Sequence, residues 1–171
     1  MKEYNIIFAD LDGTLIDTVS GETFPKGIWD MKVKFDVLDK IKELNPEYVF
    51  IISNQGGIES GFINENHFVD KCQYVCDIIK EYCKIENVWF TYCTTNDKTA
   101  EDRKPNTGMI EYMLEMYSNN EFNNELKNEL LMIGDASGKE GQFSDSDKKC
   151  AENFSIDYLD VEDFVNINWK G

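Results

Sequence analysis

Five short apolar runs alternate along the chain with segments of helical periodicity, and this alternation constrains the fold more than any other feature. The runs are residues 5–9, 48–52, 88–93, 130–133 and 156–159. Most of them are apolar at nearly every position, which is typical of parallel strands covered by helices on both faces. The sequence therefore predicts a layered α/β fold built on a parallel sheet.

Helical periodicity fills the intervals between these runs. Apolar residues recur three or four positions apart in 35–44, from about 64 to 83, from about 107 to 117 and from about 144 to 154. Asn64 is suited to cap the second helix, whose inner stripe includes Cys72, Cys76 and Cys83. With 171 residues and no repeat or linker, the chain is expected to form one domain, 1–171.

Composition excludes several classes of function. Seventeen Lys and Arg against 33 Asp and Glu give a net charge of −16, which repels phosphate polymers and anionic lipids except at a local basic patch. A basic nucleic-acid coat protein is therefore excluded. No membrane-length apolar run or signal peptide is visible, and the odd number of cysteines favours reduced thiols. We expect a cytoplasmic protein, or one of another reducing compartment, that is not secreted and has no disulfides or membrane partner.

Chemically reactive side chains follow four of the apolar runs. Asp10 and Asp12 follow the first, Ser53 the second and Asp135 the fourth, while Lys104 lies after a loop that follows the third. Parallel strands end at the same edge of a sheet, so these side chains are expected to meet there. Each has an ordinary reading as a turn, a cap or a solvated charge, but their shared placement argues against coincidence.

These residues also carry a resemblance to a known superfamily. The four motifs of the haloacid dehalogenase-like phosphohydrolases are matched by Asp10-Leu11-Asp12-Gly13-Thr14, Ser53, Lys104 and Gly134-Asp135. More narrowly, the chain resembles the phosphatase domain of polynucleotide kinase/3′-phosphatases and their stand-alone relatives, over 20–27, 54–58, 104–109 and 134–147. The last segment, a loop inserted inside the fourth motif, is the most specific. The resemblance implies a three-layer, Rossmann-like fold of the haloacid dehalogenase type, with a short flap and no cap domain.

The resemblance also implies a mechanism. Asp10 would be the nucleophile that forms an aspartyl-phosphate, and Asp12 would protonate the leaving alkoxide and then activate water. Mg²⁺ would be held by Asp10, the backbone carbonyl of Asp12 and Asp135. Asp147 is placed to support the metal from the second coordination shell or through a water. The expected cofactor is therefore Mg²⁺.

The implied substrate is a 3′-phosphate on a DNA end. Ser53 and Lys104 would hold the equatorial oxygens of the phosphoryl group. Further substrate-binding residues are predicted to be Thr14, Asn54, Arg103, Lys148 and Lys149. Phe24 and Trp29 of the flap are candidates either to stack on a terminal base or to pack internally. Relatives commonly carry basic residues after the second motif, where this chain has Glu59-Ser60-Gly61-Phe62.

Two other functions stay open at this stage. One is a small-molecule phosphatase of the same superfamily, acting on histidinol phosphate or a sugar phosphate. The other is a non-catalytic binding module, against which the complete motif set argues. The motif intervals are too short for a cap domain, and an uncapped site suits a polymer end. No phosphate-binding kinase loop occurs, so any kinase would be a separate partner.

Overall fold

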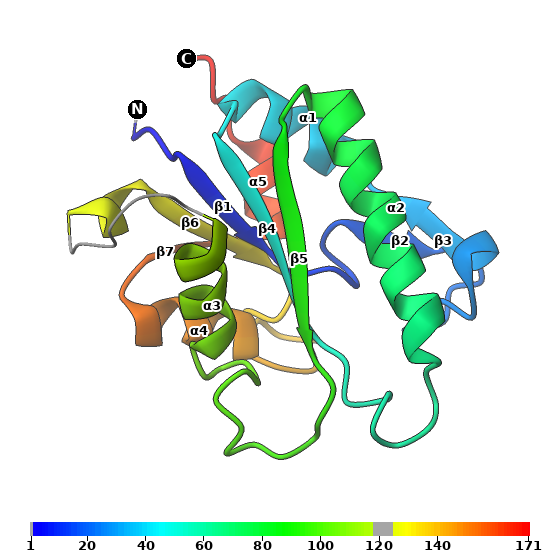
Figure 1. Ribbon diagram of the computed structural model, residues 1–171. Helices are drawn as coiled ribbons and strands as arrows, with labels where there is room; N and C mark the ends of the chain where they lie inside the picture. The colour runs from blue at the N-terminus through cyan, green and yellow to red at the C-terminus, as the bar shows by residue number, and fades with distance from the viewer. Residues whose placement is uncertain (1, 118–124) are drawn as a thin grey trace.

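The computed structural model describes residues 2–117 and 125–171. Its centre is a five-stranded sheet in which all neighbouring strands are parallel. In spatial order the strands are β5 (Asn87–Cys93), β4 (Tyr48–Asn54), β1 (Ile6–Ala9), β6 (Leu130–Gly134) and β7 (Asp157–Asp160). The apolar runs had predicted this parallel sheet, and the structure confirms it (Figure 1).

Helices cover both faces of the sheet and complete the three layers (Figure 1). One face carries α1 (Phe35–Leu44), α2 (Glu65–Cys83) and α5 (Val161–Asn166), and the other carries α3 (Gly108–Tyr117) and α4 (Ser146–Phe154). Successive side chains of a strand point to opposite faces, so Ile7 and Ala9 enter the first apolar core whereas Ile6 and Phe8 enter the second. Burial on both faces explains why the strands are continuously apolar.

The structure differs from the sequence expectations mainly at element ends. Strand β4 extends to Asn54, so Ser53 and Asn54 belong to the strand instead of following it. Helix α4 begins at Ser146, two residues later than predicted. Helix α5 was not predicted because its six residues are too few for periodicity to show. Most of the polar stretch 118–125, predicted to be a surface connection, lies outside the described residues.

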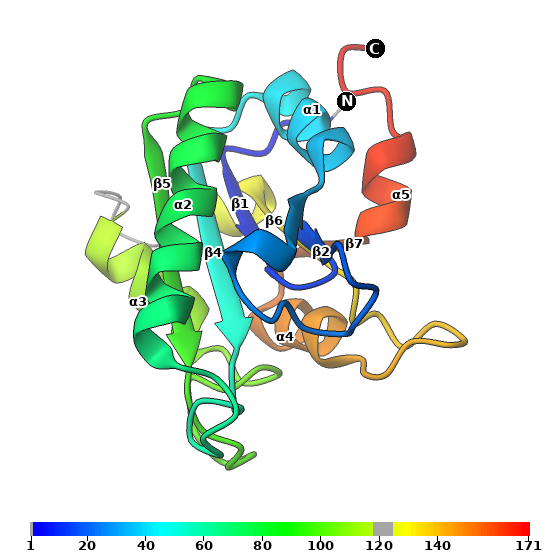
Figure 2. The same cartoon turned by 90° about the vertical axis from the view of Figure 1, so that its right-hand side faces the viewer.

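The predicted flap is a small antiparallel hairpin at the carboxyl end of the sheet (Figure 2). It consists of β2 (Ile16–Thr18) and β3 (Met31–Val33), with a 3₁₀ turn at Ile28–Asp30. The Asp30 carboxylate is buried and accepts hydrogen bonds from Ser20 N, Ser20 Oγ and Lys26 N at 2.7, 2.8 and 3.0 Å. These bonds close the hairpin loop on itself and fix the backbone at Lys26.

The five cysteines are buried and free, as the reduced-thiol prediction requires. Cys72, Cys76 and Cys83 of α2 pack in the core, which confirms their predicted place on the inner stripe. The N-cap at Asn64 is also confirmed, because its side chain accepts a hydrogen bond from His67 N at 3.1 Å. In the described ranges, no helix combines the length and apolar character needed to cross a membrane.

Candidate active site

The carboxyl ends of the strands open into one cavity of about 1030 Å³. Side chains from the ends of three strands and the loops beyond them form its polar floor: Asp10, Asp12, Ser53, Gln55, Lys104, Asp135 and Asp147. The predicted convergence of the motif residues at one sheet edge is therefore confirmed. The flap and the loops that follow β4, β5 and β6 form the walls.

Lys104 lies at the centre of this floor and is only 3% exposed. Its Nζ donates hydrogen bonds to Asp10 Oδ1 at 2.8 Å, Asp147 Oδ1 at 2.7 Å and the Ile52 carbonyl at 2.9 Å. Burial by itself would lower the pKa of the Lys104 ammonium, but the charges of Asp10 and Asp147 outweigh burial and raise this pKa above its ordinary value. Lys104 is thus a buried cation that pairs with two carboxylates at once.

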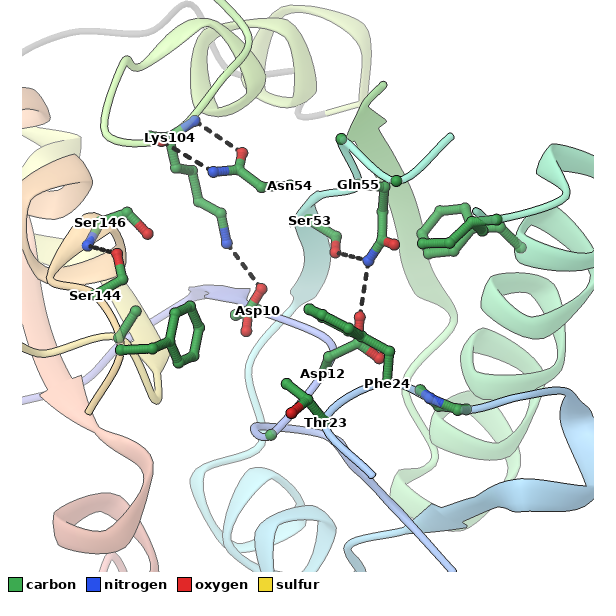
Figure 3. Close-up of a pocket in the computed structure, with 18 of the residues that line it drawn as sticks. Asp10, Asp12, Thr23, Phe24, Ser53, Asn54, Gln55, Lys104, Ser144 and Ser146 are labelled. Atoms are coloured by element: carbon green, nitrogen blue, oxygen red, sulfur yellow. Dashed lines mark hydrogen bonds and ion pairs between the residues drawn. The ribbon is translucent and has the colours of Figure 1, made fainter. Parts of the chain in front are cut away.

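Asn54 and Arg103 hold the loop that delivers Lys104. The Asn54 side chain donates to the Lys104 carbonyl and accepts from the Lys104 backbone N–H, both at 2.9 Å (Figure 3). Arg103 donates to the Thr95 carbonyl at 2.9 Å and also lines the cavity. Asn54 was predicted to bind substrate; it lines the cavity, and its amide group also anchors the Lys104 loop.

Three carboxylates form a cluster that can hold a metal ion. One oxygen each of Asp10, Asp135 and Asp147 lies within 4.8 Å of the others. Asp135 Oδ1 is buried and has no hydrogen-bond partner among the described residues, as expected for an oxygen that binds a cation. Burial, followed by the charges of Asp10 and Asp147, raises the pKa of Asp135 to about 8. The donor set therefore fits a hard divalent cation such as Mg²⁺.

Asp147 supports this cluster from the start of α4. Its Oδ2 accepts from Ala136 N at 3.1 Å, and its Oδ1 accepts from Lys104 Nζ at 2.7 Å. Burial and the charge of Asp10 raise the pKa of Asp147 to about 6, although Lys104 acts in the opposite direction. Both Asp147 oxygens are thus occupied by N–H donors, which is consistent with the predicted second-shell role.

Gly13 allows the chain to turn tightly against the cluster. Its φ is +81°, and a Cβ at this position would clash with the Asp135 carboxylate. Both features exclude other side chains here. The sharp turn predicted after Asp12 is confirmed.

Asp12 belongs to a second, separate group of polar side chains. Its carboxylate is not part of the cluster formed by Asp10, Asp135 and Asp147, so a metal role for Asp12 is limited to its backbone carbonyl. Gln55 Nε2 donates to Asp12 Oδ2 and to Ser53 Oγ, both at 2.8 Å (Figure 3). Lys71 Nζ lies 3.5 Å from Asp12 Oδ1. Lys71 was not predicted from the sequence, and Gln55 entered the sequence analysis only as part of the segment 54–58, without a role of its own.

Three of the predicted substrate-binding residues do not line the cavity. Thr14 is fully buried, and its hydroxyl lies 3.5 Å from Asp10 Oδ2, where it contacts the Asp10 carboxylate and does not reach the cavity. Lys148 and Lys149 are exposed but lie outside the lining residues. The face of α4 that holds Asp147 points inward, so the next two side chains point outward, and Lys149 pairs with Asp145 at 2.6 Å.

Three exposed phenylalanines from different loops line the outer cavity. Phe24 of the flap is 52% exposed, Phe62 after β4 is 89% exposed and Phe143 after β6 is 76% exposed. Trp29 is 74% exposed, so internal packing does not explain it, but it does not line the cavity. Lys98 in the loop after β5 is also exposed and lines the cavity. Phe62, Phe143 and Lys98 had not been predicted.

Glu59 occupies the loop where the resemblance leads one to expect basic residues. Its Oε2 accepts from Thr95 Oγ1 at 2.9 Å and from Asn96 N at 2.8 Å. These hydrogen bonds tie the loop after β4 to the loop after β5, and they lower the pKa of Glu59. The acidic residue is therefore explained by a structural role.

Comparison with known proteins decides the family. The family model described as polynucleotide kinase 3 phosphatase matches residues 5–165. The chain belongs to this family. It is 32% identical over 167 residues to the bifunctional polynucleotide phosphatase/kinase of Schizosaccharomyces pombe, covering 95% of this chain but only 38% of that protein. It is 29% identical over 175 residues to an uncharacterised 20.8 kDa protein of Autographa californica nuclear polyhedrosis virus, covering 98% and 88% of the two chains.

Solved structures confirm the fold of this family member. The D,D-heptose 1,7-bisphosphate phosphatase of B. bronchiseptica, solved with magnesium and phosphate, superposes with a TM-score of 0.65 at 18% identity, over 90% of this chain and 78% of that one. A protein of Mesorhizobium loti described as a HAD-like phosphatase gives a TM-score of 0.64 at 19% identity, over 91% and 71%. The polynucleotide kinase 3′-phosphatase family member thus has the haloacid dehalogenase-type fold that its motifs predicted.

Proposed function

We propose that this protein is a Mg²⁺-dependent phosphomonoesterase that removes the 3′-phosphate from DNA ends through an aspartyl-phosphate on Asp10. The observation that carries the proposal is the pairing of Asp10 Oδ1 with Lys104 Nζ at 2.8 Å on the floor of an open cavity. The ammonium reduces the repulsion between a carboxylate nucleophile and an anionic phosphate. Membership of the family supports the same chemistry.

The first step transfers the phosphoryl group to Asp10. A carboxylate oxygen of Asp10 attacks phosphorus, the bond from phosphorus to the leaving oxygen breaks, and its electron pair stays on that oxygen. Asp12 donates a proton to the leaving oxygen and becomes a carboxylate. All three N–H donors of Lys104 are in use, so Lys104 exchanges its bond to Asp10 for one to a phosphoryl oxygen.

The second step hydrolyses the aspartyl-phosphate. Asp12 takes a proton from a water molecule, and the water oxygen attacks phosphorus, which releases phosphate and restores Asp10. Ser53 Oγ accepts from Gln55 Nε2 at 2.8 Å, so its own hydrogen is free to donate to a phosphoryl oxygen in both steps. The separation of Asp12 from the carboxylate cluster suits a residue that exchanges protons twice.

Mg²⁺ fits the cluster formed by Asp10, Asp135 and Asp147. Asp10, Asp135 and the Asp12 carbonyl would hold the ion. Asp135 Oδ1, which has no hydrogen-bond partner within 2–117 and 125–171, supports this assignment. Asp147, whose oxygens already accept two N–H bonds, would act through a water. When bound, Mg²⁺ supplies positive charge that stabilises the transferring phosphoryl group.

The outer cavity favours a polynucleotide end over a small metabolite. Phe24, Phe62 and Phe143 offer exposed rings on which bases can stack, since every base has an apolar face. Lys98 and Arg103 line the same cavity and supply positive charge on a chain whose net charge is −16. The net negative charge of the chain is therefore compatible with binding of a polynucleotide end at this cavity.

A substrate panel tests the proposal. Phosphate release is measured with Mg²⁺ from 3′-phosphorylated and 5′-phosphorylated oligonucleotides of the same sequence, from sugar phosphates and from histidinol phosphate, with Asp10→Asn as the inactive control. We expect the highest kcat/KM for the 3′-phosphorylated oligonucleotide. A higher kcat/KM for a sugar phosphate or histidinol phosphate would establish the small-molecule function instead, and no turnover of any substrate would support a binding module.

A further inference from the structure

Lys71 is a buried charged residue in the middle of α2 that the steps above do not use. Its side chain is only 10% exposed, and its Nζ lies 5.1 Å from the centroid of the Phe68 ring. The neighbours of Lys71 on the same helical face, Phe68, Cys72 and Val75, are buried in the core. Lys71 therefore occupies a core-facing position where an apolar residue is the ordinary choice.

Stability does not explain a charge at this position. Moving an ammonium out of water costs several kcal/mol, by order of magnitude, and replacing buried ion pairs with apolar residues is often neutral or stabilising. Asp12 is the only carboxylate with which the structure pairs Lys71, within the described residues, and the separation of 3.5 Å is long for an ion pair. Apart from Asp12, the Lys71 ammonium faces the cavity that both residues line.

The two oxygens of Asp12 have different surroundings. Oδ2 accepts a hydrogen bond of 2.8 Å from Gln55 Nε2. Oδ1 is buried and makes no hydrogen bond to any described residue, although Lys71 Nζ lies 3.5 Å away. Gln55 and Lys71 come from different elements, so they hold the carboxylate from two sides. This arrangement fixes the orientation of the Asp12 carboxylate.

We infer that Lys71 is a positioning residue for Asp12, which it holds by charge so that the carboxyl group faces the leaving oxygen and later the attacking water. The inference rests on the proposed role of Asp12. In the first step the proton moves from the Asp12 carboxyl group to the leaving oxygen as the bond to phosphorus breaks, and in the second step a proton moves from water to the Asp12 carboxylate.

Aryl and alkyl phosphate substrates distinguish the role of Asp12 as acid in the first step from its role as base in the second. p-Nitrophenolate is a stable leaving group that needs little protonation, whereas an alkoxide needs a proton as it leaves. Loss of positioning should therefore affect kcat/KM, which reports the formation of the aspartyl-phosphate, only for the alkyl substrate. Hydrolysis of the aspartyl-phosphate needs Asp12 as a base whatever the substrate was, so kcat should fall for both.

The experiment compares Lys71→Met with Lys80→Met and the wild type. Lys80 is the matched control because it lies on the same helix and its Nζ also lies over an aromatic ring, at 5.1 Å from the centroid of Trp89. The substrates are p-nitrophenyl phosphate and the alkyl phosphate that the wild type turns over fastest. Stopped-flow measurement of p-nitrophenolate adds the pre-steady-state phase, in which slow hydrolysis of the intermediate appears as a burst.

For Lys71→Met we expect kcat/KM to fall about 10- to 100-fold with the alkyl phosphate and to stay within about 3-fold of the wild type with p-nitrophenyl phosphate. We also expect a burst of about one equivalent of p-nitrophenolate that the wild type and Lys80→Met lack. An equal fall in kcat/KM for both substrates without a burst would overturn the inference, and so would unchanged kinetics. Lys71→Gln, which keeps a polar end but loses the charge, gives the same test if the Met variant does not fold.

Asp12→Asn, measured in parallel, separates failure of this inference from failure of the proposed function. If Asp12→Asn loses turnover while Lys71→Met behaves as the wild type, the role of Asp12 stands and the role of Lys71 is wrong. If Asp12→Asn keeps full turnover of the alkyl phosphate, the proposed acid and base is wrong, and the inference about Lys71 falls with it.

Discussion

Lys104 Nζ donates a hydrogen bond of 2.8 Å to Asp10 Oδ1, although 94 positions of sequence separate the two residues. The contact forms only when β1 and the loop beyond β5 reach the same edge of the sheet. It places a buried cation against the proposed nucleophile, and the same ammonium also pairs with Asp147 at 2.7 Å. Because three carboxylates meet here, folding of the site depends on this charge.

Lys104→Met should therefore destabilise the protein as well as abolish turnover. The substitution leaves the buried carboxylates of Asp10 and Asp147 without their cation, which should cost about 3–5 kcal/mol of unfolding free energy. Urea unfolding in the presence of a chelator measures this loss. Adding Asp147→Asn to Lys104→Met should recover part of the stability and none of the activity. If Lys104→Met alone were as stable as the wild type, the Lys104 ammonium would not be needed to stabilise the buried carboxylates of Asp10 and Asp147, which would contradict the account.

In the absence of metal, Asp135→Asn should be more stable than the wild type at high pH, because the wild type loses stability as the pH rises and the variant does not. The pKa of Asp135 is about 8 in the folded protein because of burial and then the charges of Asp10 and Asp147, and it is about 4 in an unfolded chain. The unfolded state releases its proton first, so the wild type loses stability between about pH 4 and pH 8. Asn carries no charge and escapes this loss.

Thermal unfolding in chelator measures this difference. At pH 5 the melting temperatures of the wild type and Asp135→Asn should be similar, and at pH 8 the variant should be more stable by on the order of 2 kcal/mol, or about 4–8 °C. Mg²⁺ should raise the melting temperature of the wild type at pH 8 and have little effect on the variant. An equal Mg²⁺ effect on both proteins would count against Asp135 as a ligand.

The main-chain architecture could be predicted from the sequence because buried parallel strands have a strong signal. Continuous apolar runs such as 130–133 were sufficient to predict the sheet, and the motif residues at the strand ends were sufficient to predict the floor of the site. Lys71 could not be predicted, since its role follows from the packing of α2 against the cavity and not from any local pattern. Lys148 and Lys149 do not line the cavity, because Asp147 of α4 faces inward and the next two side chains of the helix face solvent. Their predicted contact with substrate stays a prediction.

Two variants test whether a bound strand passes Lys98 in the cavity or Lys148 and Lys149 outside it. They are Lys98→Ala and the double variant Lys148→Ala with Lys149→Ala. Lys98 lines the cavity and the other two lysines do not, so Lys98→Ala should raise KM for a 3′-phosphorylated oligonucleotide and flatten its salt dependence. Turnover of p-nitrophenyl phosphate, which has no flanking phosphates, should change little. A larger effect of the double variant would restore the assignment made from the sequence.

Phe143→Ala tests the stacking surface independently of charge. The ring is 76% exposed, so its removal should leave stability within about 0.5 kcal/mol of the wild type. Loss of one stacked base should weaken oligonucleotide binding by about 1–3 kcal/mol without changing the salt dependence. Binding is measured by fluorescence anisotropy, and Asp10→Asn is compared with the double variant Asp10→Asn with Phe143→Ala. Asp10→Asn is present in both proteins so that the oligonucleotide is not consumed. Unchanged affinity would show that bases do not reach Phe143.

The most direct test of the proposed function is to find the phosphoryl group on Asp10. The protein is mixed with Mg²⁺ and a 3′-phosphorylated oligonucleotide, quenched in acid within the first turnover, digested and analysed by mass spectrometry. The account predicts that the peptide containing Asp10 gains the mass of one phosphoryl group, and that the 5′-phosphorylated oligonucleotide of the same sequence gives none. A phosphoryl group on another residue, or phosphate release from the 3′ end with no modified peptide in wild type or Asp12→Asn, would contradict it.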